Sequence, residues 1–207
     1  MADITAALVK ELRERTGSGL MECKKALQET GGDIEAAVES MRKAGQAKAD
    51  KKASRVAAEG LVAIGQAAGA AAMVEINCET DFVTKNDDFR AFAAAVAETA
   101  LAVGPADLDA LLAAPMANGQ SVEQNRRDCI AKIGENINVR RCVRFSNPKG
   151  VLGSYLHGTR IGVLVELAGG DSGLAKDIAM HVAASRPLCV SADQVPAEVV
   201  AKEKEIY

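Results

Sequence analysis

The sequence predicts an α+β protein that joins a small helical module to a core of two related α+β subdomains with antiparallel sheets. Three observations predict this class. The first 45 residues show the spacing of three short helices, and two apolar hairpin patterns come further along the chain. A helical pattern comes directly after each hairpin, which is typical of a repeated supersecondary unit.

The helical module is predicted from its start and stop signals. Thr5 is a suitable N-cap for the first helix, which should end at Gly17. The second helix should end at Gly31, and the third should begin after Asp33 and close at Gly45. Such a small bundle offers no cavity for chemistry, so we expect it to act through contact with a partner.

An apolar pair at the first turn is the candidate contact of this module. Leu20 and Met21 come directly after Gly19, at the start of the second helix. The pattern leaves open whether these side chains are part of the core or exposed, and Met21 is the better candidate for exposure.

A basic, Ala-rich segment, residues 42–55, comes next, with Asp50 as its single acid. We interpret it as a solvated helical linker, and residues 46–58 as the linker between domains. Contact with RNA is the alternative, although the segment has no aromatic residue for base stacking.

The two hairpin patterns differ in the length of the connection to the next helix. That helix lies around Phe92 for the first hairpin and around Ile178 for the second. Aligning the copies leaves about five more residues between hairpin and helix in the first copy, and residues 78–83 fall in that interval. Because the insertion occurs in only one copy, we expect it to serve a function and not to complete the core that the two copies share. The predicted hairpin strands are residues 60–64 with 72–76, and 150–154 with 162–167.

The remaining segments complete the predicted domains. We expect a loop with a short helix at 108–112, a helix at 124–134, and a strand at 139–145 whose arginines form a solvated face. A further helix should start at Pro196. The predicted domains are a helical module at 1–45, a first core subdomain at 59–145, an incomplete second one at 146–195, and the start of a helical hairpin at 196–207.

Phe82 is the most informative residue, because it is a large apolar side chain between a strand at 73–78 and a helix from about Asp87. One interpretation is that it packs as a staple between these two elements, which residue type alone favours. The other is that Asp81 and Phe82 form a loop-borne probe that enters a partner. The insertion in the first copy favours the probe.

Composition limits the class of protein. A net charge of −3 argues against general binding of nucleic acid, and an odd count of five cysteines without paired spacing favours a reducing cytosol. Residues 1–5 show no signal peptide, and no run of about twenty apolar residues predicts a membrane span. We therefore expect a soluble cytoplasmic protein with no membrane partner.

Catalytic sites are disfavoured by the residue pattern. Cys78, His157 and Asn138 supply the residue types of a thiol hydrolase, but Cys78 ends a strand and lacks the helix N-terminus that favours a thiolate. Two distant histidines without a Cys-x-x-Cys pair disfavour zinc, and no Gly-rich phosphate loop is present. His181 should be partly buried on its helix, whereas His157 should reach out from a hairpin turn. We expect no enzyme activity, metal or cofactor, and no direct binding of nucleotide.

Several segments, taken together, resemble bacterial translation elongation factor Ts. The resemblance runs in order over essentially the whole chain, which makes it far more specific than one motif. It is carried by residues 8–17, 21–27, 78–83, 132–137, 153–157 and 160–162.

The resemblance implies a three-helix module of the ubiquitin-associated (UBA) type and the role of a guanine-nucleotide exchange factor. The implied partner is elongation factor Tu, both GDP-bound and nucleotide-free. Phe82 would be wedged behind the magnesium and phosphate sites of its G domain, and His157 would lie on the phosphate-loop side. The implied contact residues are Leu20, Met21, Lys24, Thr80, Asp81, Phe82, Val83, Ile133, Gly134 and His157.

One departure from the family concerns the C-terminus. Most bacterial members continue through a helical hairpin and return to the second subdomain with another strand, whereas this sequence stops at Tyr207. We expect a truncated chain, or else a short form, with an open sheet edge. The alternatives from other classes are a UBA-type protein-binding module and an RNA-associated protein. The latter would use residues 42–55 and the strand that carries Arg140, Arg141 and Arg144.

Overall fold

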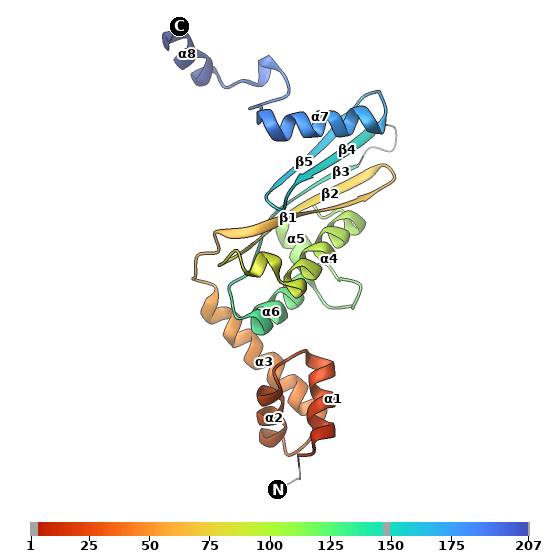
Figure 1. The fold of residues 1–207 in the computed structure, drawn as a ribbon, viewed down its shortest axis with the longest axis vertical. Helices are drawn as coiled ribbons and strands as arrows, with labels where there is room; N and C mark the ends of the chain where they lie inside the picture. Colours follow the sequence, from red (N-terminus) through yellow and green to blue (C-terminus); the bar gives the residue numbers. More distant parts are fainter. Residues whose placement is uncertain (1–3, 147–149, 207) are drawn as a thin grey trace.

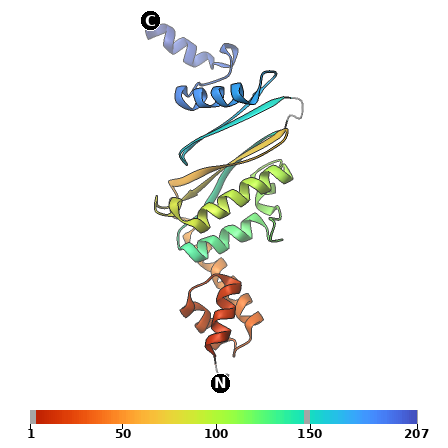
Figure 2. The same ribbon diagram turned by 45° about the vertical axis from the view of Figure 1, so that its right-hand side comes forward.

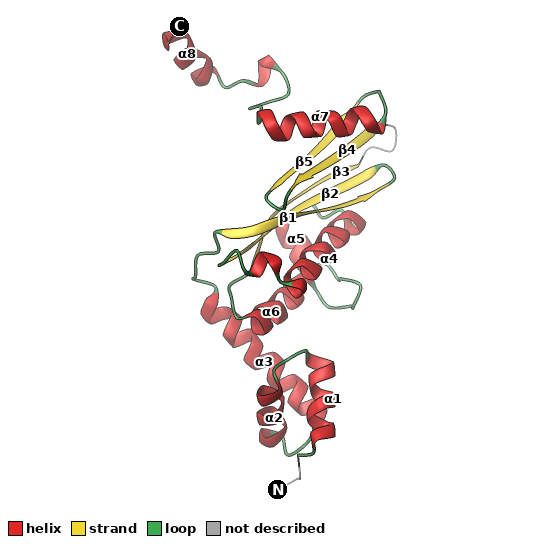
Figure 3. Ribbon diagram, in the orientation of Figure 1, coloured by secondary structure: helices red, strands yellow, loops and turns green. Residues whose placement is uncertain are grey.

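The computed structural model describes residues 4–146 and 150–206, so the predicted features at residues 1–3 and at Tyr207 lie outside the described residues. The chain forms an elongated molecule, with the N-terminal helices at one end, the sheets in the middle and the last helix at the other end (Figure 1). Helices and antiparallel strands are both present, as Figure 3 shows, which confirms the predicted α+β class.

The N-terminal module consists of α1 (Ala6–Thr16), α2 (Leu20–Glu29) and the first part of α3 (Ile34–Lys52). The predicted caps are confirmed. The Thr5 hydroxyl accepts a hydrogen bond from the N–H of Leu8, Gly17 ends α1 in the left-handed conformation, and the Asp33 carboxylate caps α3. The module has its own small core of buried side chains: Val9, Leu12, Cys23, Ala26, Leu27 and Ala37.

The predicted end of the third helix at Gly45 is wrong, because α3 continues to Lys52. Gly45 is buried inside the helix, and a Cβ atom there would lie 3.2 Å from the Cβ of Ala131 in α6 (Val122–Ile133). The glycine therefore allows two helices to pack closely and does not stop one. Ala49 is buried in the main core, so one face of this helical segment is packed, while Lys48, Asp50 and Lys51 are exposed as predicted for a solvated linker.

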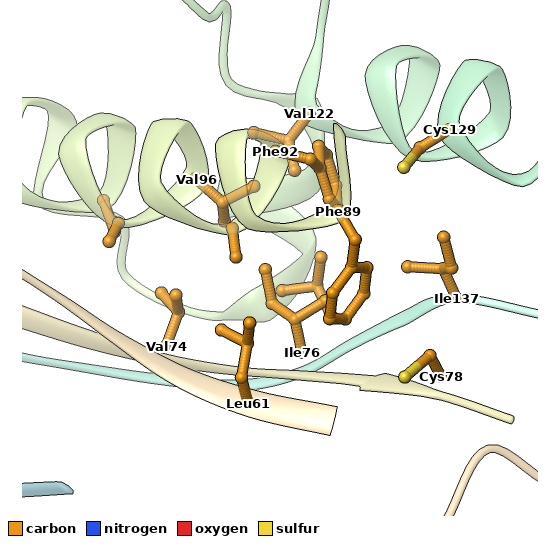
Figure 4. Close-up of a cluster of buried hydrophobic side chains, with 14 of the residues drawn as sticks. Leu61, Val74, Ile76, Cys78, Phe89, Phe92, Val96, Val122, Cys129 and Ile137 are labelled. Carbon is orange, nitrogen blue, oxygen red and sulfur yellow. The ribbon is translucent and has the colours of Figure 1, made fainter. Parts of the chain in front are cut away.

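The first hairpin unit contains β1 (Glu59–Ala67) and β2 (Ala70–Cys78), followed by α4 (Asp87–Val103). Strand β3 (Asn138–Ser146) adds to β2, so the sheet has the antiparallel order β1-β2-β3. Helix α4 lies across one face of this sheet, and α5 (Leu108–Ala113) and α6 pack behind it. Figure 4 shows the resulting core, in which Phe89 and Val96 of α4 pack onto Val74 and Ile76 of β2.

The second hairpin unit repeats this plan with fewer parts. Strands β4 (Val151–His157) and β5 (Ile161–Leu167) pair antiparallel, and α7 (Ser172–Ser185) covers them. Figure 2 shows the layers in the order α7, β4–β5, β1–β3 and α4. The sheets lie close together, because a Cβ on Gly162 would be 2.6 Å from the sulfur of Met73.

The chain ends with a short turn, η2 (Ala192–Gln194), and α8 (Ala197–Ile206), none of whose described residues is buried. The prediction of a helix after Pro196 is confirmed. The prediction that His181 is partly buried is wrong, because its side chain is exposed on α7. Within the described residues, no helix is long and apolar enough to cross a bilayer.

Candidate functional site

Phe82 is exposed on the loop that joins β2 to α4. Its side chain is 78% exposed, whereas Phe89 and Phe92 of α4 are buried. The staple interpretation is therefore wrong. Phe89 of α4 packs between helix and sheet (Figure 4), whereas the ring of Phe82 faces solvent.

The backbone of this loop is held by the carboxylate of Glu135, which lies between α6 and β3. One Glu135 oxygen accepts hydrogen bonds from the N–H groups of Glu79 and Thr80, both at 3.0 Å. The other accepts the Thr80 hydroxyl at 2.7 Å. Beyond Phe82, the Thr84 hydroxyl donates to the carbonyl of Asp81 at 2.6 Å. Phe82 is thus carried on a backbone fixed from both sides.

Lys85, in the turn η1 (Val83–Lys85), accompanies the two side chains at the tip of the loop. Its ammonium lies 3.7 Å from the Asp81 carboxylate and 5.9 Å from the centroid of the Phe82 ring. Both contacts are exposed, so each contributes about 1 kcal/mol or less. The loop therefore presents an acid, an aromatic ring and a cation to solvent.

The neighbours of Phe82 in the implied contact set have different environments. Val83 is 8% exposed and belongs to the main core, so it anchors the loop from below. Thr80 is half-buried against Glu135. Ile133 is half-buried at the end of α6, and Gly134 ends that helix with a positive φ of 90°. The Gly134 carbonyl accepts a hydrogen bond from Lys52 at the end of α3.

His157 reaches out beside the turn between β4 and β5, as predicted. Its Nδ1 lies 3.0 Å from the hydroxyl of Tyr155. Arg160 in the same turn forms an ion pair with Glu59, which faces Cys78 across the first hairpin. Because Cys78 is the last residue before the Phe82 loop, this turn and the loop lie on the same side of the molecule (Figure 1).

The structure answers the open question about the N-terminal pair, because both side chains are exposed: Leu20 to 55% and Met21 to 72%. Lys24, one turn further along α2, is exposed as well. The preceding turn lies near the start of α4. Lys132 forms an ion pair with Asp88 at 2.7 Å, and a Cβ on Gly17 would lie 3.6 Å from its ammonium.

We call six of the predicted positions the contact row: Leu20, Met21, Asp81, Phe82, Gly134 and His157. Lys132, Glu135 and Arg160 make polar contacts beside these positions, with Asp88, Thr80 and Glu59 respectively. The row combines exposed apolar side chains with the carboxylate of Asp81, and the cations of Lys24 and Lys85 lie beside it. This composition is suited to binding a protein surface.

Comparison with known proteins gives a consistent result. Residues 79–207 match the family model described as Elongation factor TS. Elongation factor Ts of Methylococcus capsulatus is 65% identical over 206 residues, and that of Thioalkalivibrio sulfidiphilus is 61% identical over 207. This chain belongs to the elongation factor Ts family. The alignments cover 99% of the chain and 70% of each of these two relatives.

The environment of Cys78 contradicts the hydrolase interpretation. Cys78 is fully buried, and burial, with the nearby charges of Glu135 and Glu59, raises the pKa of its thiol to about 11. The thiol is therefore protonated at neutral pH and donates to the Thr80 carbonyl at 3.2 Å. In this member of the elongation factor Ts family, Cys78 supports the Phe82 loop. Among the described residues, no group of three or more His, Cys, Asp or Glu side chains is arranged to hold a metal ion.

The arginines of β3 have partners within the protein. Arg140 and Arg141 form ion pairs with Glu75 at 3.8 and 2.5 Å, and Arg144 donates to the carbonyl of Leu101 at 3.0 Å. Arg144 is half-buried, so the predicted solvated face holds only in part. This arrangement gives an RNA-binding role for the strand no support.

Two residues of the site were missed by sequence reasoning. Glu135 lies within one of the segments that resemble elongation factor Ts, but nothing local signals that it bonds a loop more than fifty residues away. Lys85 could have been found, because it follows Asp81 at the i,i+4 spacing that brings opposite charges together within a turn of helix.

Proposed function

We propose that this chain is a guanine-nucleotide exchange factor that binds elongation factor Tu and promotes the release of GDP during translation elongation. Asp81 and Phe82 enter the G domain near the magnesium and phosphate sites. The observation that carries this proposal is the exposed Phe82 ring on a loop fixed by Glu135 and Thr84. Membership of the elongation factor Ts family supports it. In this role the chain catalyses no chemical step and binds no nucleotide itself.

A fixed, exposed ring suits a wedge for two reasons. Because Phe82 faces water in the free protein, binding removes its apolar surface from solvent, which contributes roughly 1.5–3 kcal/mol. Because the loop is already ordered, little conformational entropy is lost on binding. At 1.4 kcal/mol per decade, the Phe82 contact contributes about one to two decades in an equilibrium constant.

Exchange needs more than this one contact, and the rest of the contact row supplies candidates. The N-terminal module would lie on the G domain through Leu20, Met21 and Lys24, while His157 would approach the phosphate loop. Ile133 and Gly134 would contact the same domain, with Thr80 and Val83 supporting the probe. The second hairpin unit would face the third domain of elongation factor Tu.

The mechanism is a coupling between two binding equilibria. An exchange factor must bind nucleotide-free elongation factor Tu more tightly than the GDP-bound form, and linkage makes the loss in GDP affinity equal to the loss in factor affinity. Side chains that displace the elements around magnesium and phosphate would weaken the charge-assisted contacts to GDP. Phe82 acts at that step, so its removal should reduce exchange more than complex formation.

The test is the release of fluorescent GDP from elongation factor Tu with the intact chain and with Phe82→Ala. We expect acceleration by the intact chain and a loss of about ten- to a hundredfold in the maximal rate with Phe82→Ala. Val103→Ala is the matched control, because Val103 is an exposed apolar residue at the far end of α4. Equal losses of exchange and of complex formation would contradict the wedge. If the chain did not bind elongation factor Tu, a UBA-type binding module would become the leading interpretation.

A further inference from the structure

Three segments of the chain meet at the base of the Phe82 loop. They are the first residues of the loop, the turn at residues 134–136, and the end of α3 with the residues directly after it. Asn136, which is fully buried, donates from its N–H to the carboxylate of Glu79 at 2.6 Å and from its side-chain amide to the carbonyl of Arg55 at 2.7 Å. Lys52 bonds the carbonyl of Gly134. We call these contacts, together with the hydrogen bonds that Glu135 accepts from Glu79 and Thr80, the loop clasp.

Glu135 is the centre of the loop clasp. The ladder between β1 and β2 ends at the pair Glu59 and Cys78, so the N–H groups of Glu79 and Thr80 lie beyond the last strand partner. The carboxylate of Glu135 takes the place of that partner and accepts both N–H groups. Hydrogen bonds to a charged group are stronger than those between neutral groups, so this anchor is firm.

Both oxygens of Glu135 are engaged by the loop, and its side chain is half-buried. The carboxylate therefore faces Thr80 and not the tip of the loop. Any effect of Glu135 on a partner must pass through the loop that it holds.

We propose that Glu135 is a positioning residue of nucleotide exchange, which holds residues 79–81 so that Phe82 is presented in the orientation that enters the partner. Asn136 and Lys52 tie the same anchor to α3, the helix that carries the N-terminal module. The inference rests on the proposed function, because it assigns Glu135 a role in that same site.

The first experiment measures loop opening in the free protein. Chymotrypsin cleaves after exposed phenylalanines when the backbone can open, so the rate of cleavage after Phe82 reports on the loop clasp. Glu135→Ala should raise this rate about tenfold, equivalent to about 1.4 kcal/mol of lost protection. Glu135→Gln keeps the shape and one acceptor oxygen but loses the charge, so it should raise the rate by a smaller factor, about threefold. This variant provides a readout if the alanine variant fails to fold.

The matched control is Glu123→Ala in α6. Glu123 is also partly buried and accepts hydrogen bonds from Arg126 and Arg127, but it makes them within its own helix. The Glu123→Ala variant should lose a comparable number of polar contacts, but chymotrypsin should cleave it after Phe82 no faster than the unaltered chain. Unchanged cleavage in Glu135→Ala, or equal acceleration in both alanine variants, would overturn the loop clasp.

The second experiment is a double-mutant cycle in the GDP-release assay. Glu135→Ala alone should lower the maximal rate about tenfold, but less than about twofold when Phe82→Ala is already present, because it acts through that ring. Additive losses would overturn the positioning role. A normal rate for Phe82→Ala would instead reject the wedge of the proposed function, while faster cleavage after Phe82 would still support the anchor.

Discussion

The two hairpin units of the core share a plan but differ in what has been added to it. In the first, residues 79–86 connect β2 to α4, whereas in the second the shorter segment 168–171 connects β5 to α7. The first unit also has the strand β3 and the helix α6, and its core includes fully buried Phe89. The core of the second is a small cluster around Val163, Ala179 and Ala183.

The additions to the first unit belong together. Glu135, which anchors the longer loop, lies between α6 and β3, the two elements that the second unit lacks among the described residues. An exposed aromatic ring on a long loop needs a rigid support, because an unsupported loop would lose its order in solution. The first unit therefore carries both the proposed contact loop and most of the buried core of the two units.

The largest expected effect is on stability. Phe89→Ala should lower the free energy of unfolding of the first unit by about 3–5 kcal/mol, because it removes a fully buried ring from the core. Val163→Ala should cost the second unit only about 1.5 kcal/mol. Urea titration followed by hydrogen exchange in each unit measures both losses. Similar losses would mean that the two units have equally developed cores.

The next effect concerns the exchange rate. Phe82→Ala should lower the maximal rate by about one to two decades, whereas Leu174→Ala should change it by less than about twofold. Leu174 is 47% exposed near the start of α7, just after the shorter connection of the second unit. Titration with elongation factor Tu separates the maximal rate from the concentration required. A large loss in the maximal rate with Leu174→Ala would place part of the wedge in the second unit.

A smaller effect should come from the glycines that bring each helix close to its hairpin. A Cβ on Gly153 would lie 2.6 Å from the backbone carbon of Ala175, and one on Gly65 would lie 2.9 Å from the carbonyl oxygen of Ala97. Gly153→Ala should cost about 1–3 kcal/mol and Gly65→Ala less, because its contacts are longer. Thermal unfolding of the two variants tests this order, and the reverse order would show that the second unit adapts more easily.

The smallest effect is a loss of stability in alkali that is confined to the first unit. Burial raises the pKa of Cys129 from 9.0 to about 12 in the folded state. The folded state therefore favours the neutral thiol. The resulting contribution to the free energy of unfolding is complete below pH 9 and is lost as the pH rises toward 12. Unfolding measured between pH 8 and about 10.5 should show a shallower decline for Cys129→Ala. An unchanged slope would contradict the assignment to Cys129.

The local parts of the fold could be predicted, because their signals lie within a few residues. Helix starts are signalled by caps such as Thr5 and Asp33, and the hairpins by alternating apolar residues. These signals do not depend on which other elements pack against the helix or hairpin. The end of the third helix was predicted wrongly at Gly45, because a glycine in a helical pattern can indicate either a helix end or a close packing contact. Only the presence of α6 distinguishes the two.

The site was predicted less completely for the same reason. Phe82 could be singled out as an unusual residue in a loop, but its exposure depended on whether Phe89 filled the space beside it. Glu135 could not be assigned a role, because its hydrogen bonds join segments distant in sequence. Residue type and spacing identify candidates, and the tertiary contacts decide what each one does.

The continuity of α3 has a consequence for how a partner is engaged. One uninterrupted helix of 19 residues, roughly 28 Å long at 1.5 Å per residue, runs from the module that bears Met21 to the core that bears Phe82. Burial of Gly45 and Ala49 against the core makes it a stiff spacer. In the proposed complex, binding at one end would hold the other end at a high effective concentration over a single distance. The proposed function therefore implies a preference for partners whose two docking points have that separation.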